Sequence, residues 1–139
     1  MPTLPEDLTA IKTPDNIHEA RFASSPYVLR KAFERDPAVQ RLIHAGRAAA
    51  PLVIQELKAA AQLDEITRAC LVYILEQVDG AAVPPVVAPL LRADLARPGP
   101  FFAPFATHAL RNAARLPNPG SVKLEYSPAE VREALDSTH

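Results

Sequence analysis

The chain has 139 residues, of which 48% are hydrophobic and 22% charged; this fits one globular domain and excludes wholesale disorder. The net charge is -1 and the isoelectric point is near 6.4, which disfavours a dedicated nucleic-acid binder, because such domains usually exceed about 9. A single cysteine, Cys70, excludes an internal disulfide, and we expect a reducing, cytoplasmic compartment. No apolar run reaches the ~20 residues of a membrane helix, and Glu6 and Asp7 stand where a signal peptide would be apolar. Arginine supplies eleven of the fifteen basic residues and alanine is abundant, a composition typical of GC-rich bacterial genomes.

The first 45 residues predict a lead-in followed by two short helices. Residues 1–24 hold three prolines and scattered apolar side chains, so we expect an irregular segment with one helical turn at most, over 17–22. Ser25-Pro26 and Asp36-Pro37 each combine a capping residue with a proline whose missing N–H needs no partner in a first helical turn. The second of these helices is expected to stop at Gly46.

The middle of the chain predicts two helices that form the centre of the domain. One covers about 49–62, and the other begins after an N-cap at Asp64 and continues to about residue 78. Residues 69–75 are apolar nearly all round, which is typical of a helix with neighbours on several sides. Asp79-Gly80 ends this helix.

The last third predicts two long helices, over about 83–95 and 101–115, and a tail. The tail contains an extended piece over 122–126 and a helix opened by the capping box Ser127-Pro128-Ala129-Glu130. No segment shows the strict alternation of a strand. We therefore expect an all-α protein of about six to seven helices, antiparallel where the connections are short.

An internal repeat supports a specific arrangement of these helices. Residues 48–54 align with 81–87 at an offset of 33, and Leu57 then matches Leu90. Each segment is followed by a second helix with small inner residues, Arg68-Ala69-Cys70 in one and His108-Ala109-Leu110 in the other. A period of this length is typical of stacked helical repeats.

These segments resemble HEAT-like α-helical repeats over about residues 46–115, with 26–45 as a degenerate first pair. The resemblance is carried by Ala50-Pro51-Leu52-Val53-Ile54-x-x-Leu57, by Asp64-x-Ile66-x-Arg68-Ala69-Cys70 and by Val83-Pro84-Pro85-Val86-Val87-x-x-Leu90. It implies a short right-handed superhelix of antiparallel pairs over 25–116, followed by a C-terminal extension, 117–139, with one capping helix. It also implies a binding scaffold, since family members mostly act in that way.

The residues that could carry chemistry favour structural roles. The four histidines have no metal-ligand spacing, and Cys70 lies in the most apolar stretch, where a thiol behaves as a small hydrophobe. Asp64 and Glu65 are neighbours that suit a cap and a first turn rather than an acid–base pair. No phosphate loop or nucleophile motif occurs. We expect no catalytic residue, metal site or cofactor.

Charge is unevenly distributed, because residues 83–120 hold four arginines and only one acid. One interpretation is a solvated face, and another is a docking patch for an acidic protein surface. A nucleic-acid or phosphate site is disfavoured because aromatic residues do not alternate with the arginines. The three phenylalanines within 101–105 predict a core plug or, where exposed, a contact surface. The candidate partner-binding residues are Arg68, Arg92, Arg97, Phe101, His108, Arg111 and Arg115.

Three functions remain open from the sequence. The first is non-catalytic binding of a protein partner through a preformed helical surface. The second is a structural homo-oligomer, such as a homodimer, in which open repeat ends stack; the helix over 127–135 decides this by capping the end or leaving it exposed. The third, and least supported, is a small helical enzyme that uses His108 and Arg111.

Overall fold

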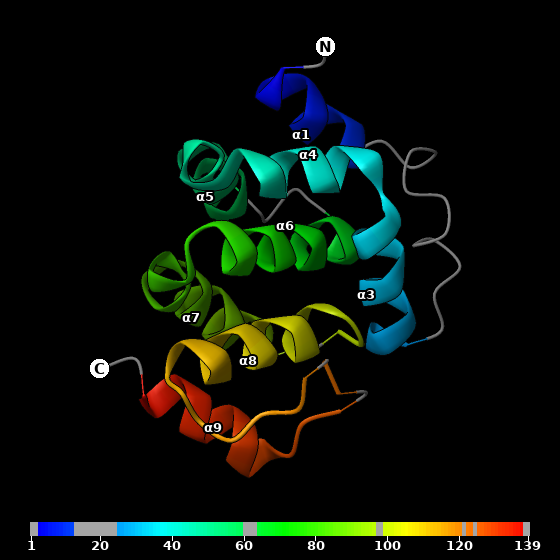
Figure 1. Cartoon of the computed structure of the whole chain (residues 1–139). Helices are drawn as coiled ribbons and strands as arrows, with labels where there is room; N and C mark the ends of the chain where they lie inside the picture. Colours follow the sequence, from blue (N-terminus) through cyan, green and yellow to red (C-terminus); the bar gives the residue numbers. More distant parts are fainter. Residues whose placement is uncertain are drawn as a thin grey trace.

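The structure is a computed structural model that describes residues 3–12, 25–59, 64–96, 99–120, 122–123 and 125–137. Within these ranges it contains eight α-helices and no strand, which confirms the all-α prediction (Figure 1). The number of helices exceeds the expected six to seven because the predicted lead-in contains one.

That additional helix is α1 (Leu4–Lys12), and it corrects the expectation of an irregular start. The Thr3 hydroxyl caps it by accepting from the backbone N–H of Glu6 at 3.3 Å. Pro5 does not interrupt it, because a proline in the first turn lacks only an N–H that would have no helical partner. Leu8 and Ile11 are buried and join the core. The helical turn considered over 17–22 lies outside the described residues.

The two predicted helix starts after the lead-in are confirmed. Helices α3 (Pro26–Arg35) and α4 (Pro37–Ala45) each begin with proline, and the side chains of Ser25 and Asp36 accept from backbone N–H groups three residues on. Helix α4 ends at Gly46, whose φ of 63° suits glycine because it has no Cβ to clash.

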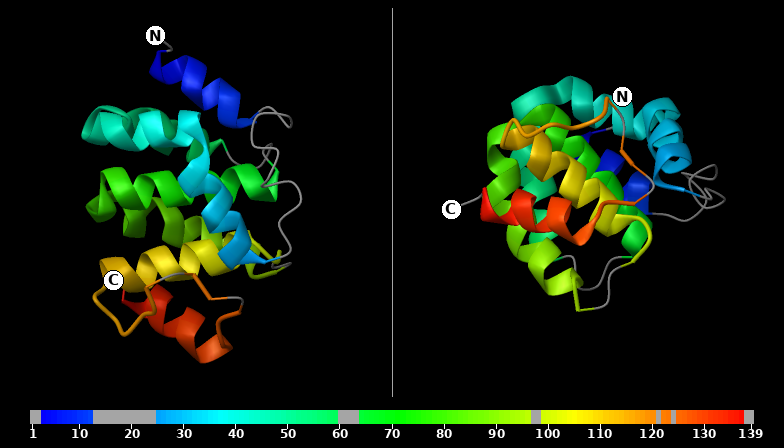
Figure 2. Two further views of the ribbon diagram at one scale, coloured as in Figure 1. Left: turned by 45° about the vertical axis from the view of Figure 1, so that its right-hand side comes forward. Right: turned by 90° about the horizontal axis from the view of Figure 1, so that it is seen from below.

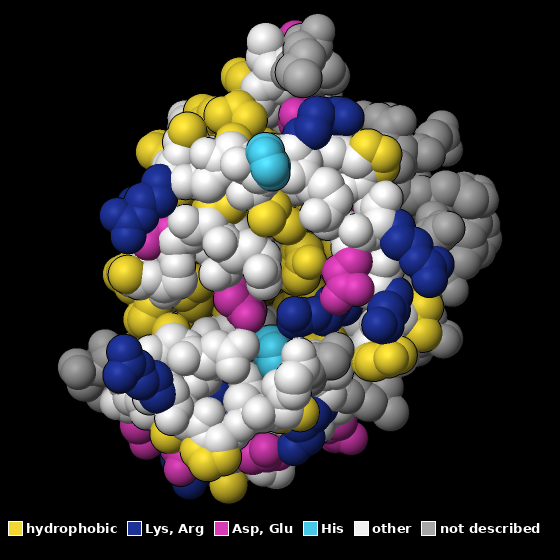
Figure 3. Space-filling model, viewed as in Figure 1, with side chains coloured by type: hydrophobic (Ala, Val, Ile, Leu, Met, Phe, Trp, Pro, Cys, Tyr) yellow, Lys and Arg dark blue, Asp and Glu magenta, His cyan; other side chains and the backbone are white. Residues whose placement is uncertain are grey.

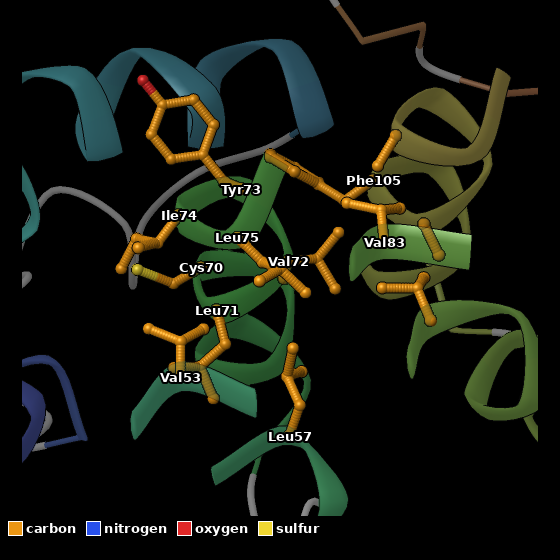
Figure 4. Packing of buried hydrophobic residues seen from close by; sticks show 14 of the residues in the cluster. Val53, Leu57, Cys70, Leu71, Val72, Tyr73, Ile74, Leu75, Val83 and Phe105 are labelled. Atoms are coloured by element: carbon orange, nitrogen blue, oxygen red, sulfur yellow. The ribbon is translucent and has the colours of Figure 1, made fainter. Parts of the chain in front are cut away.

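Two helices form the centre of the molecule, α5 (Ala50–Lys58) and α6 (Glu65–Val78). As predicted, Asp64 caps α6, accepting from Thr67 N at 2.7 Å. Helix α6 is buried on nearly all sides, and Figure 4 shows its side chains meeting those of neighbouring helices. Cys70 is fully buried there and burial raises the pKa of its thiol well above the usual value, so it is an unreactive core residue.

The last three helices are α7 (Val83–Asp94), α8 (Phe102–Ala113) and α9 (Pro128–Asp136). The predicted capping box of α9 is present, with Ser127 and Glu130 bonded to each other's backbone N–H groups. Phe102 and Phe105 are buried, so the phenylalanine cluster is mainly core.

Helices α4, α6 and α8 lie side by side in one layer, and α5 and α7 contact each other beside it. Helix α1 packs on α4 at one end of the molecule and α9 packs on α8 at the other (Figure 2). Helix α9 therefore covers a side of α8 that would otherwise face solvent. None of the described helices has the length and apolarity needed to cross a membrane.

Candidate functional site

Arg111 does not line an exposed surface, and that part of the site prediction is wrong. Its side chain is only 5% exposed. The guanidinium donates to the carbonyl of Pro117 at 2.8 Å, to the carbonyl of Glu130 at 3.1 Å and to the Glu133 carboxylate at 2.8 Å. The positive charge expected to meet a partner instead fastens the C-terminal tail to α8, because a buried arginine needs this number of acceptors.

Arg115 does not share a helix face with Arg111, because α8 ends at Ala113. Arg115 has a φ of 58°, the left-handed conformation, and follows the last turn. The backbone N–H of Arg115 donates to the carbonyl of Asn112, and the backbone N–H of Leu116 donates to the carbonyl of Arg111. This double hydrogen bond is a Schellman motif, which closes helix ends and usually places glycine where Arg115 stands.

Arg68 lies half-buried between three helices, with 19% of its side chain exposed. Its guanidinium forms an ion pair with Asp94 at 3.5 Å and stacks over the Phe102 ring at 3.9 Å. Arg68 Nε and Asp94 Oδ2 are buried and make no hydrogen bond within the described part of the chain. Arg97, another of the predicted site residues, lies outside the described residues.

Glu65 has a role that the sequence analysis missed. Its carboxylate accepts from the backbone N–H groups of Phe101 and Phe102 at 2.8 and 3.1 Å, and so caps α8 from another helix. A Cβ on Gly99 would overlap this carboxylate, which explains a glycine there. The available signal was that Phe101, at the start of the predicted helix, cannot cap it.

His108 is buried within a hydrogen-bonded network. Nδ1 lies 2.9 Å from Tyr126 Oη, and Nε2 lies 3.3 Å from the amide nitrogen of Asn112. The Asn112 amide is a donor, since it also donates to Glu76, and so Nε2 of His108 accepts from it. The Tyr126 hydroxyl donates its proton to Asn118 and therefore accepts from Nδ1. These directions assign a neutral imidazole with its proton on Nδ1. Asn118 donates in turn to the carbonyl of His108 at 3.0 Å.

Electrostatics keep His108 neutral. Burial, and then the charge of Arg30, lower the pKa of His108 to about 4. Burial raises the pKa of Tyr126 to about 12 and also raises the pKa of Glu76. On the face seen in Figure 3, acidic and basic side chains meet between α6 and α8. The network joins the tail to α8, so His108 is a structural residue here.

A groove of about 840 Å³ lies between the C-terminal end of α7, the first half of α8 and the inner side of α9. We call it the α8–α9 groove. Its apolar walls include Pro100, Phe101, Pro104, Tyr126, Val131 and Leu135. Two of the predicted site residues meet here, Phe101 in the wall and Arg92 at the rim, where Arg92 donates to the carbonyl of Leu135 at 3.2 Å. His108 and Arg111 do not line it.

The groove has one buried polar group and a charged rim. Thr107 lines it, is 0% exposed, and its hydroxyl makes no hydrogen bond within the described ranges. A buried hydroxyl without a partner is destabilising, by about 1–3 kcal/mol. Glu125 and Arg132 lie at the rim, exposed to solvent.

No cluster of three metal-ligating side chains occurs among the described residues. Comparison of the chain with protein-family models, with curated proteins and with solved structures finds no match.

Proposed function

We propose that this chain is a non-catalytic binding module that holds a segment of a partner protein in the α8–α9 groove. The observation that carries the proposal is the groove itself, about 840 Å³ with mostly apolar walls and a buried, unsatisfied Thr107 hydroxyl. Concave apolar sites of 300–1,000 Å³ with few polar groups are where proteins generally bind ligands. The proposal keeps a reducing, cytoplasmic compartment, which the lone buried thiol of Cys70 supports.

A HEAT-like stack is part of this proposal. It is supported by the repeat at an offset of 33 and by the pattern of contacts, in which α5 meets α7 and α6 meets α8 while α5 pairs with α6 and α7 with α8. In such a stack α9 covers the terminal helix. The groove then lies between the last repeat and its cap, a site that only the C-terminal extension creates.

Several contacts hold the walls of the groove together, which favours binding. Arg111 and the His108 network fasten the tail to α8, and the capping box orders α9. A site that is formed before binding costs little ordering entropy when a ligand arrives, so more of the contact energy becomes affinity.

The proposal is tested by filling the groove. Ala103 lines it and Ala81 is exposed elsewhere, so Ala103→Trp is the test and Ala81→Trp the matched control. Wild type and both variants are used as bait in lysate of the native cell, and bound proteins are quantified by mass spectrometry. We expect proteins captured by wild type and by Ala81→Trp to be lost with Ala103→Trp, with all three folded by circular dichroism. The same captured set with all three baits would reject the groove as the binding site.

The alternative, a structural homo-oligomer, has one observation in its favour. Tyr27 and Val28, at the start of α3, are 50% and 42% exposed. Light scattering across a wide concentration range tests it. A monomer of 15.1 kDa throughout supports a surface kept for another protein. A dimer at low micromolar concentration that Tyr27→Ser and Val28→Ser dissociate supports self-assembly instead.

A further inference from the structure

A second hollow, of about 310 Å³, lies at the opposite end of α8 from the α8–α9 groove. We call it the α6–α8 hollow, because the last turns of these two helices line it together with the short 3₁₀ helix η3 (Gly80–Ala82). Its floor is fully buried. The surface that an occupant can touch belongs to the half-buried Glu76 and to four exposed residues, Gln77, Gly80, Asn112 and Ala113.

Glu76 is the one charged residue among the described residues that line the hollow. The Asn112 amide donates to its Oε1 at 2.9 Å and so orients the carboxylate. The second oxygen, Oε2, makes no hydrogen bond within the described ranges and is not among the buried atoms, so it can accept from a group in the hollow. Burial raises the pKa of Glu76, which indicates that a nearby cation would stabilise the ionised carboxylate.

The cation of the fold whose charge acts on Glu76 is Arg30, and it is engaged elsewhere. Its guanidinium bonds to Glu34 at 3.4 Å and lies 5.3 Å from the centre of the Tyr73 ring. No ion pair joins Arg30 to Glu76 in the part of the chain that the structure describes. Because Glu34 offsets the charge of Arg30 and His108 is neutral, the carboxylate of Glu76 is left without an ion-pair partner.

Two helix ends add to the negative potential of the hollow. Helix α6 ends at Val78 and α8 at Ala113, and both helices end on the same side of the molecule (Figure 1). The C-terminus of a helix carries about half a negative charge. Helix α7 begins here with the opposite polarity, but Pro84 and Pro85 remove two N–H groups from its first turn and weaken its positive end. The hollow therefore favours a cation.

The donor set selects the kind of cation. A metal ion needs several oxygen ligands, and a guanidinium favours a carboxylate with both oxygens free. A single free oxygen suits the compact charge of an ammonium group. We propose that the α6–α8 hollow binds a primary ammonium group that donates to Glu76 Oε2, with its alkyl chain beside Ala113. This site is separate from the α8–α9 groove and does not depend on the function proposed for it.

An NMR titration of the whole ¹⁵N-labelled chain tests the site. The probe is n-butylammonium chloride, 1-butanol is the neutral probe of the same length, and sodium chloride keeps the ionic strength constant. We expect butylammonium to bind with millimolar affinity and to shift the amide signals of Gln77, Gly80 and Ala113, whereas butanol should leave them in place. Equal shifts with both probes, or none with butylammonium, would overturn the proposal.

Variants make the test specific. Glu76→Gln removes the charge and should weaken butylammonium binding about three- to tenfold, whereas Glu6→Gln, an exposed position on α1, changes the net charge equally and should leave the affinity unchanged. Ala113→Lys places the chain's own ammonium at the hollow and should abolish binding. Ala129→Lys, at an exposed position on α9, is its control. Equal effects within either pair would show that only net charge attracts the probe, which would overturn the site.

A further probe distinguishes two sources of the ammonium group. Nα-acetyl-lysine N-methylamide presents the lysine side chain as it occurs within a protein. If it binds as tightly as butylammonium and is lost with Glu76→Gln, the site is assigned to a lysine of a partner protein. If butylammonium alone binds in that way, the site is assigned to a free amine. If neither probe depends on Glu76, the proposal is overturned.

Discussion

Glu65 and Phe101 are 36 positions apart, yet the carboxylate of one lies 2.8 Å from the backbone nitrogen of the other. The carboxylate also accepts from Phe102 N, so one side chain in the first turn of α6 satisfies two N–H groups at the start of α8. Free N–H groups and the positive end of the helix dipole both favour an anion there. The contact fixes where α8 begins, and with it the Phe101 wall of the groove.

Removing this remote cap should destabilise the fold. We expect Glu65→Ala to lower the free energy of unfolding by about 1–2 kcal/mol, as for loss of an N-cap, and Glu65→Gln, which keeps an acceptor, to lower it by less. Urea unfolding measures both. Gly99→Ala should also destabilise, because its Cβ meets the Glu65 carboxylate, but by less in the Glu65→Ala background. If the losses of stability caused by Glu65→Ala and Gly99→Ala simply added in the double variant, the contact between the two positions would be contradicted.

Arg115 should be replaceable by glycine with a gain in stability. A left-handed conformation is strained for a residue with a Cβ, and glycine removes that strain at some cost in unfolded-chain entropy. We expect Arg115→Gly to raise the free energy of unfolding by about 0.5–1 kcal/mol. Arg115→Ala, which keeps the Cβ, is the control and should show no gain. An equal gain in both would mean that the arginine charge, and not its backbone, is the cause.

The low pKa of His108 should appear as a dependence of stability on pH. In the unfolded chain a histidine takes up its proton below about 6.5, whereas the folded one does so only near 4. The unfolded state therefore binds more protons between these values, and stability falls as pH is lowered through that window. Wild type should lose about 2 kcal/mol more than His108→Gln between pH 7 and pH 5.

Two features make that comparison clean. The hydrogen bonds from Lys123 and Ser127 lower the pKa of Glu130 to about 2, so the capping box of α9 keeps its charge throughout this range. All other titrating groups are common to both proteins, including Glu76 and the remaining histidines. Equal slopes for wild type and His108→Gln would show that His108 takes up its proton normally in the fold.

Thr107→Val should stabilise the fold. Valine has nearly the same shape and removes a buried hydroxyl that has no partner, so we expect a gain of about 1 kcal/mol in thermal or urea unfolding. Thr107→Ser keeps the hydroxyl and loses a methyl group, and should instead cost about 1 kcal/mol. A destabilised valine variant would indicate that the hydroxyl is satisfied in the fold.

Helix identity and most helix boundaries could be predicted from local sequence. Ser25, Asp36, Asp64 and Ser127 each cap the helix that the sequence assigned to them, because a cap acts over three residues and needs no distant partner. Gly46 ends α4 for an equally local reason. The error at α1 arose from Pro5, whose effect depends on its position within the first turn.

The candidate site could not be predicted in the same way. Phe101 and Arg92 do meet at the groove, but the clustering of arginines along the chain did not indicate which of them would be exposed. Arg111 is buried by acceptors from the tail, and Arg68 is partly covered by Asp94 and Phe102. Whether a charge faces solvent depends on which helices pack over it.

The sequence alone determined an all-helical chain, the start of most of its helices and the burial of Cys70, because periodicity and capping are interactions within one or two turns. Only the tertiary structure decided that α9 lies on α8, that Arg111 and His108 fasten it there, and that a groove with an unsatisfied Thr107 remains between them. These features depend on contacts between segments far apart in the chain, and the positions of such segments follow from the packing of the whole core.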